Sequence, residues 1–123
     1  MSSIIYKRSG ENVRKLADCL ARYNPYLRGA PPGLPFKLDE AAIMRGLNFT
    51  LTTAIGDLDI LGEIAGGGTY EDLVPDTVQL TVFGEQCLCL SLHRLIQTKR
   101  AAGRPKDLEV IAELETLLQD DDT

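Results

Sequence analysis

The spacing of apolar residues along the chain predicts four helices and one short helical turn. Residues 10–23 and 105–119 repeat apolar side chains at intervals of three and four, which is typical of a helix with one buried side. Shorter helices are expected at residues 40–45 and 92–102, and a single capped turn at residues 69–72. The residues expected to begin or end these helices are Ser9, Asp39, Ser91, Gly103 and the pair Asn24-Pro25.

Alternation of apolar and polar residues with a period of two predicts five strands. Residues 48–53 and 57–61 are separated by a short turn, so they are expected to pair as an antiparallel hairpin. Residues 77–83 and 86–90 form a second expected hairpin, and residues 2–6 a first short strand. Because hairpins dominate, we expect an α+β fold with a mixed, mostly antiparallel sheet and helices packed on it.

Length and composition indicate one globular domain covering residues 1–123. The chain is 44% hydrophobic and 25% charged, which is ordinary for a globular protein. Residues 26–38 are rich in Pro and Gly but also carry apolar side chains, so a loop within the domain is expected rather than a linker. Residues 66–68 predict a glycine hinge, and residues 120–123 a solvated acidic tail.

Charge and cysteine content narrow the possible functions. The net charge of −5 argues against general nucleic-acid binding, which needs a basic surface. Neither a membrane span nor a secretory signal is predicted. Three cysteines (Cys19, Cys87 and Cys89) do not form a disulfide framework, and the last two are expected on one face of one strand as small apolar residues. A reducing cytoplasmic location fits best.

Asp57 and Asp59 are the most informative polar pair. Residues two apart in a strand project from the same face, so their carboxylates are expected close together. Such carboxylates repel each other unless a cation or a basic group lies between them. Mg²⁺ binds through one or two carboxylates together with substrate phosphates. The pair therefore predicts either a metal site or the solvent-facing side of a sheet.

A basic cluster at residues 99–106 is the second candidate site. Lys99 lies in the last turn of one expected helix, where the helix dipole favours a positive charge. Arg104 and Lys106 lie at the start of the next helix, where the dipole does not favour them, so a phosphate or the strand carboxylates could be their partner. The alternative is a solvated helix end. His93, the only histidine, is expected to be an exposed residue at a helix start.

Three stretches, residues 46–53, 56–63 and 99–108, resemble a group of small bacterial nucleotidyltransferase-fold proteins. This group belongs to the polymerase-beta-like superfamily and lies near the nucleotidyl transferase toxins of abortive-infection systems. The resemblance runs from about residue 4 to residue 118. Its most specific part is the run Lys-Arg-Ala-Ala-Gly-Arg-Pro-Lys-Asp at residues 99–107.

The resemblance implies three acidic ligands for Mg²⁺. It places Asp59, with Asp57, at the position of the third acid, and Lys99, Arg104 and Lys106 as contacts for a nucleoside triphosphate. The two other acids would come from an Asp-x-Asp strand. Matching the end of that strand to residues 5–9 puts Met1 and Ser3 in their places. The helix and glycine turn that precede this strand in the family have no counterpart, so the chain resembles a truncated or diverged member.

We therefore expect a minimal nucleotidyltransferase-like fold that is catalytically incomplete and retains weak Mg²⁺-nucleotide binding. One alternative is an active nucleotidyltransferase whose missing acids come from a partner chain. Another is a non-catalytic interaction module, toxin–antitoxin-like or homodimeric. A shortened first strand would leave apolar surface uncovered around residues 4–6, which predicts a homodimer or a partner protein at this place.

Overall fold

The computed structural model describes residues 2–64, 68–74, 80–82 and 85–122 of the chain. Its helices are α1 (Gly10–Ala21), α2 (Glu40–Arg45), α3 (Tyr70–Leu73), α4 (Leu92–Ala102) and α5 (Pro105–Asp122). Its strands are β1 (Ser2–Tyr6), β2 (Tyr26–Leu27), β3 (Asn48–Thr53), β4 (Gly56–Leu61), β5 (Glu63–Ile64), β6 (Gly68–Thr69), β7 (Leu80–Val82), β8 (Glu85–Cys87) and β9 (Cys89–Ser91).

Five strands form one central sheet in the order β2-β3-β4-β1-β9. β1 and β4 run parallel, and the other neighbouring strands are antiparallel. Two further pairs, β5 with β6 and β7 with β8, form separate two-stranded sheets. The predicted α+β class and the mixed, mostly antiparallel sheet are therefore confirmed, as is the hairpin of β3 and β4.

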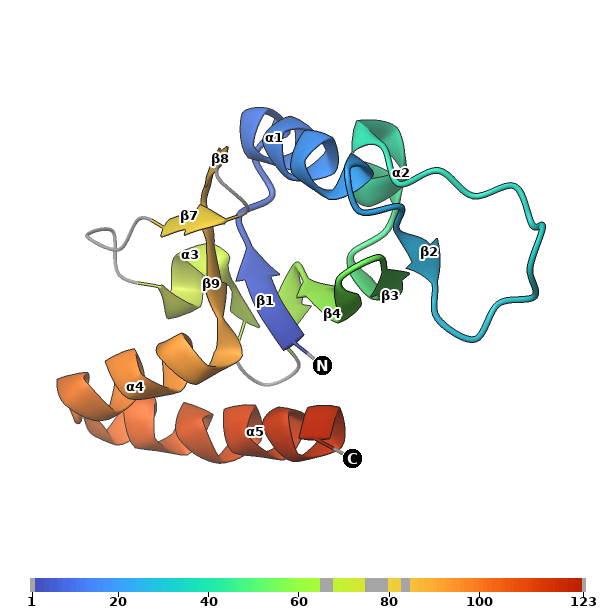
Figure 1. Ribbon diagram of the computed structural model, residues 1–123. Helices are drawn as coiled ribbons and strands as arrows, with labels where there is room; N and C mark the ends of the chain where they lie inside the picture. Colours follow the sequence, from blue (N-terminus) through green and yellow to red (C-terminus); the bar gives the residue numbers. More distant parts are fainter. Residues whose placement is uncertain (1, 65–67, 75–79, 83–84, 123) are drawn as a thin grey trace.

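The central sheet separates two hydrophobic cores (Figure 1). α1 and α2 pack on one face, and α4 and α5 on the other. β1 contributes to both cores because its side chains alternate: Ile4 and Tyr6 join the first core, and Ile5 joins the second. β4 gives Leu58 and Ile60 to the first core. Among the described residues, no helix is long and apolar enough to cross a membrane.

The position of β1 corrects the predicted association surface. β1 lies between β4 and β9, not at an edge of the sheet. Ile4 is 7% exposed, and Ile5 and Tyr6 are fully buried within the chain. The apolar residues predicted to form a dimer contact therefore lie inside the protein's own two cores. The predicted location of that contact was wrong.

The local signals for helix ends are confirmed. Ser9, Asp39 and Ser91 each accept a hydrogen bond from the backbone N–H three residues further on. The carboxylate of Asp72 likewise accepts from the backbone N–H of Thr69, and this hydrogen bond lowers the pKa of Asp72. α4 is followed by Gly103 in the left-handed region, with φ of 66°, a conformation that favours glycine.

Some predicted ends differ from the structure. α1 ends at Ala21 and not at residue 23, because the chain closes a turn there with the Tyr23 N–H bonded to the Leu20 carbonyl. α5 continues to Asp122, although acidic residues are unfavourable at the negative end of a helix dipole. Of the strand predicted at residues 77–83, only 80–82 are described, and residues 66 and 67 of the glycine hinge also lie outside the described residues.

Asn12 divides what the sequence presented as one strand at residues 86–90. Its side-chain amide donates to the carbonyls of Lys7 and Leu88 at 2.8 and 2.9 Å, and its Oδ1 accepts from the Leu88 N–H at 2.6 Å. The Leu88 N–H thereby bonds to a buried side chain, and the Leu88 carbonyl is shared between that side chain and the Lys7 N–H, 2.9 Å away, directly after β1. The chain consequently leaves the β7–β8 pair before Leu88 and joins the central sheet after it.

Arg8 joins α2 to the central sheet. Its guanidinium donates to the carbonyls of Ile43, Met44 and Gly46 at 2.8–3.1 Å, and these carbonyls lie at the C-terminal end of α2. It also donates to the hydroxyl of Tyr6 at 3.0 Å. Burial raises the pKa of Tyr6, whose hydroxyl remains a donor to the Leu47 carbonyl at 2.7 Å. One side chain thus holds the end of α2 against β1.

Replacing Arg8 should destabilise the protein through these carbonyls. Arg8→Ala leaves three helix-end carbonyls without their charged donor, so we expect the free energy of unfolding to fall by about 2 kcal/mol. Urea denaturation followed by circular dichroism measures the change. Arg14→Ala, an exposed arginine on α1, is the matched control and should shift the free energy of unfolding by less than about 0.5 kcal/mol. Equal losses in both variants would contradict the role of Arg8.

Candidate functional site

Asp57 and Asp59 project from the face of β4 opposite to the first core. Leu58 and Ile60 alternate with them and are buried in that core, so the strand fixes the direction of both carboxylates. The side chain of Asp57 is 40% exposed and that of Asp59 is 13% exposed. The structure therefore brings the predicted pair together on one face, with one carboxylate reaching solvent and the other largely covered.

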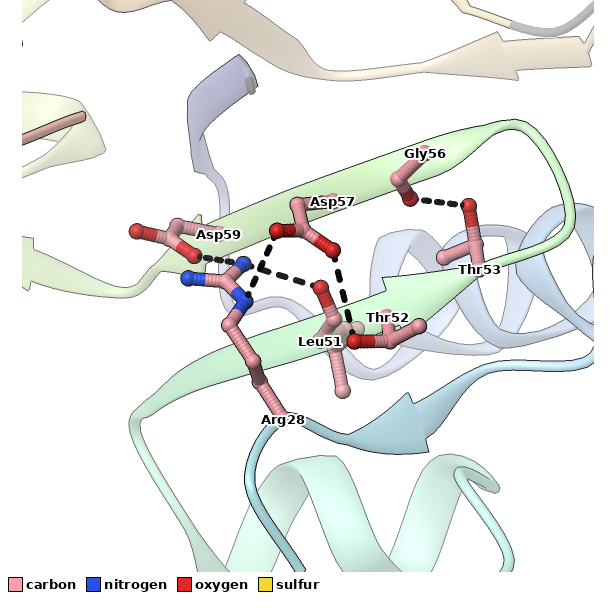
Figure 2. Close-up of polar contacts among 7 residues, drawn as sticks. All are labelled: Arg28, Leu51, Thr52, Thr53, Gly56, Asp57 and Asp59. Carbon is pink, nitrogen blue, oxygen red and sulfur yellow. Dashed lines mark hydrogen bonds and ion pairs between the residues drawn. The ribbon is translucent and has the colours of Figure 1, made fainter. Parts of the chain in front are cut away.

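Arg28 lies between the two carboxylates (Figure 2). Its Nη2 is 2.6 Å from Asp59 Oδ1 and also donates to the Leu51 carbonyl at 2.9 Å. Its Nε is 3.5 Å from Asp57 Oδ2, an ion pair too long for a strong hydrogen bond. Within the described part of the chain, this buried Nε has no hydrogen-bond acceptor. We call Arg28, Asp57 and Asp59 the Arg28 cluster.

Strand register arranges the polar residues around this cluster in two rows across the sheet. Tyr26 on β2 pairs with Thr52 on β3, and Thr52 pairs with Asp57 on β4. The second row runs from Thr50 through Asp59 to Ser3 on β1. Directly paired residues share a face, so both rows lie on the same side of the sheet.

Two hydroxyl residues in these rows lie beside the carboxylates. The Thr52 hydroxyl donates to Asp57 Oδ1 at 3.3 Å. Ser3, the residue that the family resemblance puts in place of an aspartate, is buried and is the register partner of Asp59. Met1, the other such position, lies outside the described residues.

Whether a metal ion fits these residues depends on whether groups other than protein side chains complete its coordination. Among the described residues, no group of three or more His, Cys, Asp or Glu side chains is placed to hold a metal ion. Two carboxylates on one face nevertheless match the way Mg²⁺ binds together with phosphates. The Arg28 cluster thus fits an ion that arrives with a phosphate ligand better than a resident ion held by protein alone.

Asp107 accounts for two residues of the predicted basic cluster. This carboxylate is only 1% exposed and accepts from Arg104 Nε at 2.8 Å and from the Arg104 N–H at 3.2 Å. Lys99, 8% exposed, reaches it at 3.4 Å. The hydrogen bond from the Arg104 side chain lowers the pKa of Asp107, and the same bond raises the pKa of Arg104. This arrangement joins the end of α4 to the start of α5.

The structure does not bring the basic cluster to the carboxylates of β4. The connection between α4 and α5 lies at the left edge of Figure 1, whereas β3 and β4 lie to the right of centre. Lys106 is exposed, and the Arg100 guanidinium bonds to Glu115 on α5. Of the predicted site residues, Asp57 and Asp59 therefore lie together, while Lys99, Arg104 and Lys106 lie in a separate place.

The remaining candidate residues, one histidine and two cysteines, lie away from the Arg28 cluster. His93 is exposed in the first turn of α4, as predicted. Cys87 and Cys89 are on two strands, β8 and β9, and not on one as predicted, but both are buried in the first core. Burial, followed by the nearness of Cys87 and Cys19, raises the pKa of Cys89 to about 12. That thiol is consequently protonated and unreactive at neutral pH.

Substitution of Asp107 should show that its contacts stabilise the fold. Asp107→Asn leaves the buried ammonium of Lys99 without its anion, so the melting temperature should fall by several degrees at pH 7. The pKa of Asp107 is lowered in the folded protein, so its stabilisation is fully present above its unfolded pKa of about 3.9 and disappears as the pH falls through the folded pKa.

The loss in melting temperature caused by Asp107→Asn should therefore shrink below about pH 4, as thermal denaturation monitored from pH 7 to pH 3 would measure. Lys106→Ala is the control, because Lys106 is exposed in the same turn, and it should leave the melting temperature unchanged. A loss that stays constant with pH would show that the charge of Asp107 is not what stabilises the fold.

Comparison with known proteins gives no information on the function of this chain, so the functional argument depends on its own residues. A scan against protein-family models and searches of curated proteins and of solved structures find no match. The resemblance to nucleotidyltransferases therefore stays a prediction. The geometry contributes the Arg28 cluster, in which two carboxylates on one strand face are joined by a guanidinium that no sequence motif indicates.

Proposed function

We propose that this protein has a nucleotidyltransferase-like fold and binds a Mg²⁺-nucleotide weakly at the Arg28 cluster without transferring the nucleotide. The observation that supports this proposal is the ion-paired arrangement of Asp57, Asp59 and Arg28 on an accessible face of the sheet. In the bound protein a cation takes the place of Arg28 beside the two carboxylates, and a phosphate group takes the place of the carboxylates beside Arg28.

The chemistry of the three side chains matches the two parts of such a ligand. Carboxylate oxygens are preferred ligands of Mg²⁺, which normally retains water and phosphate oxygens as its other ligands. A guanidinium forms paired hydrogen bonds with phosphate oxygens. Asp57 and Asp59 would hold the Mg²⁺ ion, and Arg28 would pair with the phosphates that accompany it instead of with the carboxylates.

The same arrangement explains why binding is weak. Arg28 already neutralises the carboxylates, and its contact with Asp59 is short and largely covered. The ligand must break this contact and the bond to the Leu51 carbonyl before it gains its own interactions. The free energy of binding is therefore only the difference between two sets of charged contacts.

The absence of transfer follows from the ligands that two-metal chemistry requires. Two metal ions about 3.5–4 Å apart need several carboxylates to hold them against the phosphates. The position across from Asp59 is Ser3, whose neutral hydroxyl is a poor substitute for a carboxylate. Asp57 and Asp59 suffice for one ion but not for a two-ion centre.

Calorimetric titration tests the binding proposal. Titration with Mg²⁺-ATP should give a dissociation constant on the order of 1 mM, about −4 kcal/mol. Asp59→Asn should weaken binding at least tenfold, because it removes the anionic ligand and keeps the size of the side chain. Lys106→Ala is the control, and it should bind like the wild type if the site is at the Arg28 cluster. Loss of binding in Lys106→Ala alone would place the site at the α4–α5 connection.

A second variant tests the displacement of Arg28 from the carboxylates. In Arg28→Gln the carboxylates lose a positive neighbour, so Mg²⁺ alone should bind more tightly than it binds to the wild type. Mg²⁺-ATP should gain less from the substitution than Mg²⁺ does, because the guanidinium contact to phosphate is lost. Identical changes for both ligands would show that Arg28 does not contact the phosphates.

Incubation with labelled nucleoside triphosphates tests the absence of transfer. With Mg²⁺ or Mn²⁺ present, the protein itself, RNA and small hydroxyl acceptors should all remain unlabelled. Robust labelling that Asp59→Asn abolishes would instead support an active transferase. Labelling that appears only after addition of a second protein would favour the alternative in which a partner chain supplies the missing acids.

A further inference from the structure

The Pro- and Gly-rich loop borders a shallow hollow, open to solvent, beside β3. The hollow has a volume of about 420 Å³. Its walls are mostly apolar and come from β2, from the loop that follows it and from one residue of β3. The residues that line it are Tyr26, Leu27, Gly29, Ala30, Pro32, Gly33 and Thr52. We call this space the loop hollow.

The hydroxyl of Tyr26 holds the loop in this shape. It donates to the carbonyl of Pro31 and accepts from the N–H of Leu34 at 3.2 Å, so it joins two points of the turn. The ring of Tyr26 also packs edge-to-face against Phe36, with centroids 6.0 Å apart. Gly29 and Gly33 adopt φ of 81° and 89°, which other residues rarely adopt. These contacts fix the shape of the loop that borders the hollow.

The loop hollow adjoins the Arg28 cluster directly. Thr52 lines the hollow and donates to the carboxylate of Asp57. Arg28 lies in the chain between Leu27 and Gly29, which both line the hollow. Figure 2 shows the Arg28 and Thr52 side chains on either side of Asp57. The apolar hollow and the charged cluster thus share no residue, but they are joined by the hydrogen bond from Thr52 to Asp57 and by the chain on both sides of Arg28.

We infer that the loop hollow binds the planar base of the nucleotide whose phosphates and Mg²⁺ occupy the Arg28 cluster; this inference rests on the proposed function. The row Tyr26–Thr52–Asp57 crosses two strand spacings, or about 10 Å, which suits the span from the base to the outer phosphates of an extended nucleotide. A mostly apolar wall with an aromatic ring suits a base, whose faces are apolar in every nucleotide.

The charged neighbour favours a nucleotide over other apolar ligands. A ligand that extends from the hollow across Thr52 toward β4 passes over Arg28 and the two carboxylates. A ribose triphosphate with Mg²⁺ presents both charges there, whereas a hydrocarbon chain would cover charged groups without replacing their contacts. The loop hollow is consequently a ring subsite and the Arg28 cluster a phosphate subsite, and the two bind different parts of one ligand.

Comparison of two probes separates the ring subsite from the phosphate subsite. Mg²⁺-tripolyphosphate tests the Arg28 cluster alone, and Mg²⁺-ATP tests the cluster and the loop hollow together. We expect wild-type protein to bind Mg²⁺-ATP about tenfold more tightly than Mg²⁺-tripolyphosphate, the difference being the stacking and burial of the base. Equal affinity for the two probes would overturn the ring subsite and leave the proposed function intact. Absence of binding for both probes would overturn the proposed function and the ring subsite with it.

Two variants give independent tests of the hollow. Tyr26→Leu removes the aromatic wall, and Ala30→Leu fills the space while leaving Tyr26 and its hydrogen bonds in place. Both should lose the tenfold preference for Mg²⁺-ATP and retain wild-type affinity for Mg²⁺-tripolyphosphate. Leu34→Ala, an exposed change in the same loop that does not line the hollow, should retain the preference. An unchanged preference in Ala30→Leu would contradict the inference even if Tyr26→Leu failed to fold.

Discussion

Burial of β1 on both faces is the constraint on which the rest of the fold depends. The strand lies between a parallel and an antiparallel neighbour, and its side chains enter both hydrophobic cores. Both edges of β1 are therefore hydrogen-bonded to neighbouring strands. Helices must cover each face, and Arg8, two residues after the end of the strand, holds α2 against one of them. The same constraint removes β1 as a surface for association.

The two helices on the second face shape the candidate site. α4 and α5 cover the apolar side chains of β1 and β9, so on this face the apolar residues gather at one side of the sheet. The other side carries threonines on β3 and the two aspartates of β4. Paired carboxylates on a half-covered face require a counter-charge, and Arg28 provides it from outside the central strands. The polar site is thus the part of the sheet that the helices leave uncovered.

Local interactions explain which features the sequence could predict. The capping residues Ser9, Asp39 and Ser91 act within four residues of the chain, and the alternation in β3 and β4 decides which side chains share a face. Arg28 was missed because its partners lie more than twenty residues away and depend on the register of three strands. Asn12 was missed for the same reason, since its amide bonds to Leu88. The basic run ending at Asp107 suggested a phosphate partner because a sequence does not show that the carboxylate three residues after Arg104 is buried and bonded to it.

The parallel pairing of β1 with β4 also has a consequence for folding order. Ile4 pairs with Ile60 and with Ser91, whereas β3 and β4 are joined by a two-residue turn. Long loops must close before β1 gains either neighbour, so the β3–β4 hairpin is expected to form early and β1 to dock late. Until then its apolar residues and unpaired backbone are open to other unfolded chains, a recognised route to aggregation. Pulsed hydrogen exchange would time the protection of the Ile4 and Ile5 amides. β1, which is buried on both faces in the native protein, is thus a vulnerable segment while the protein is being made.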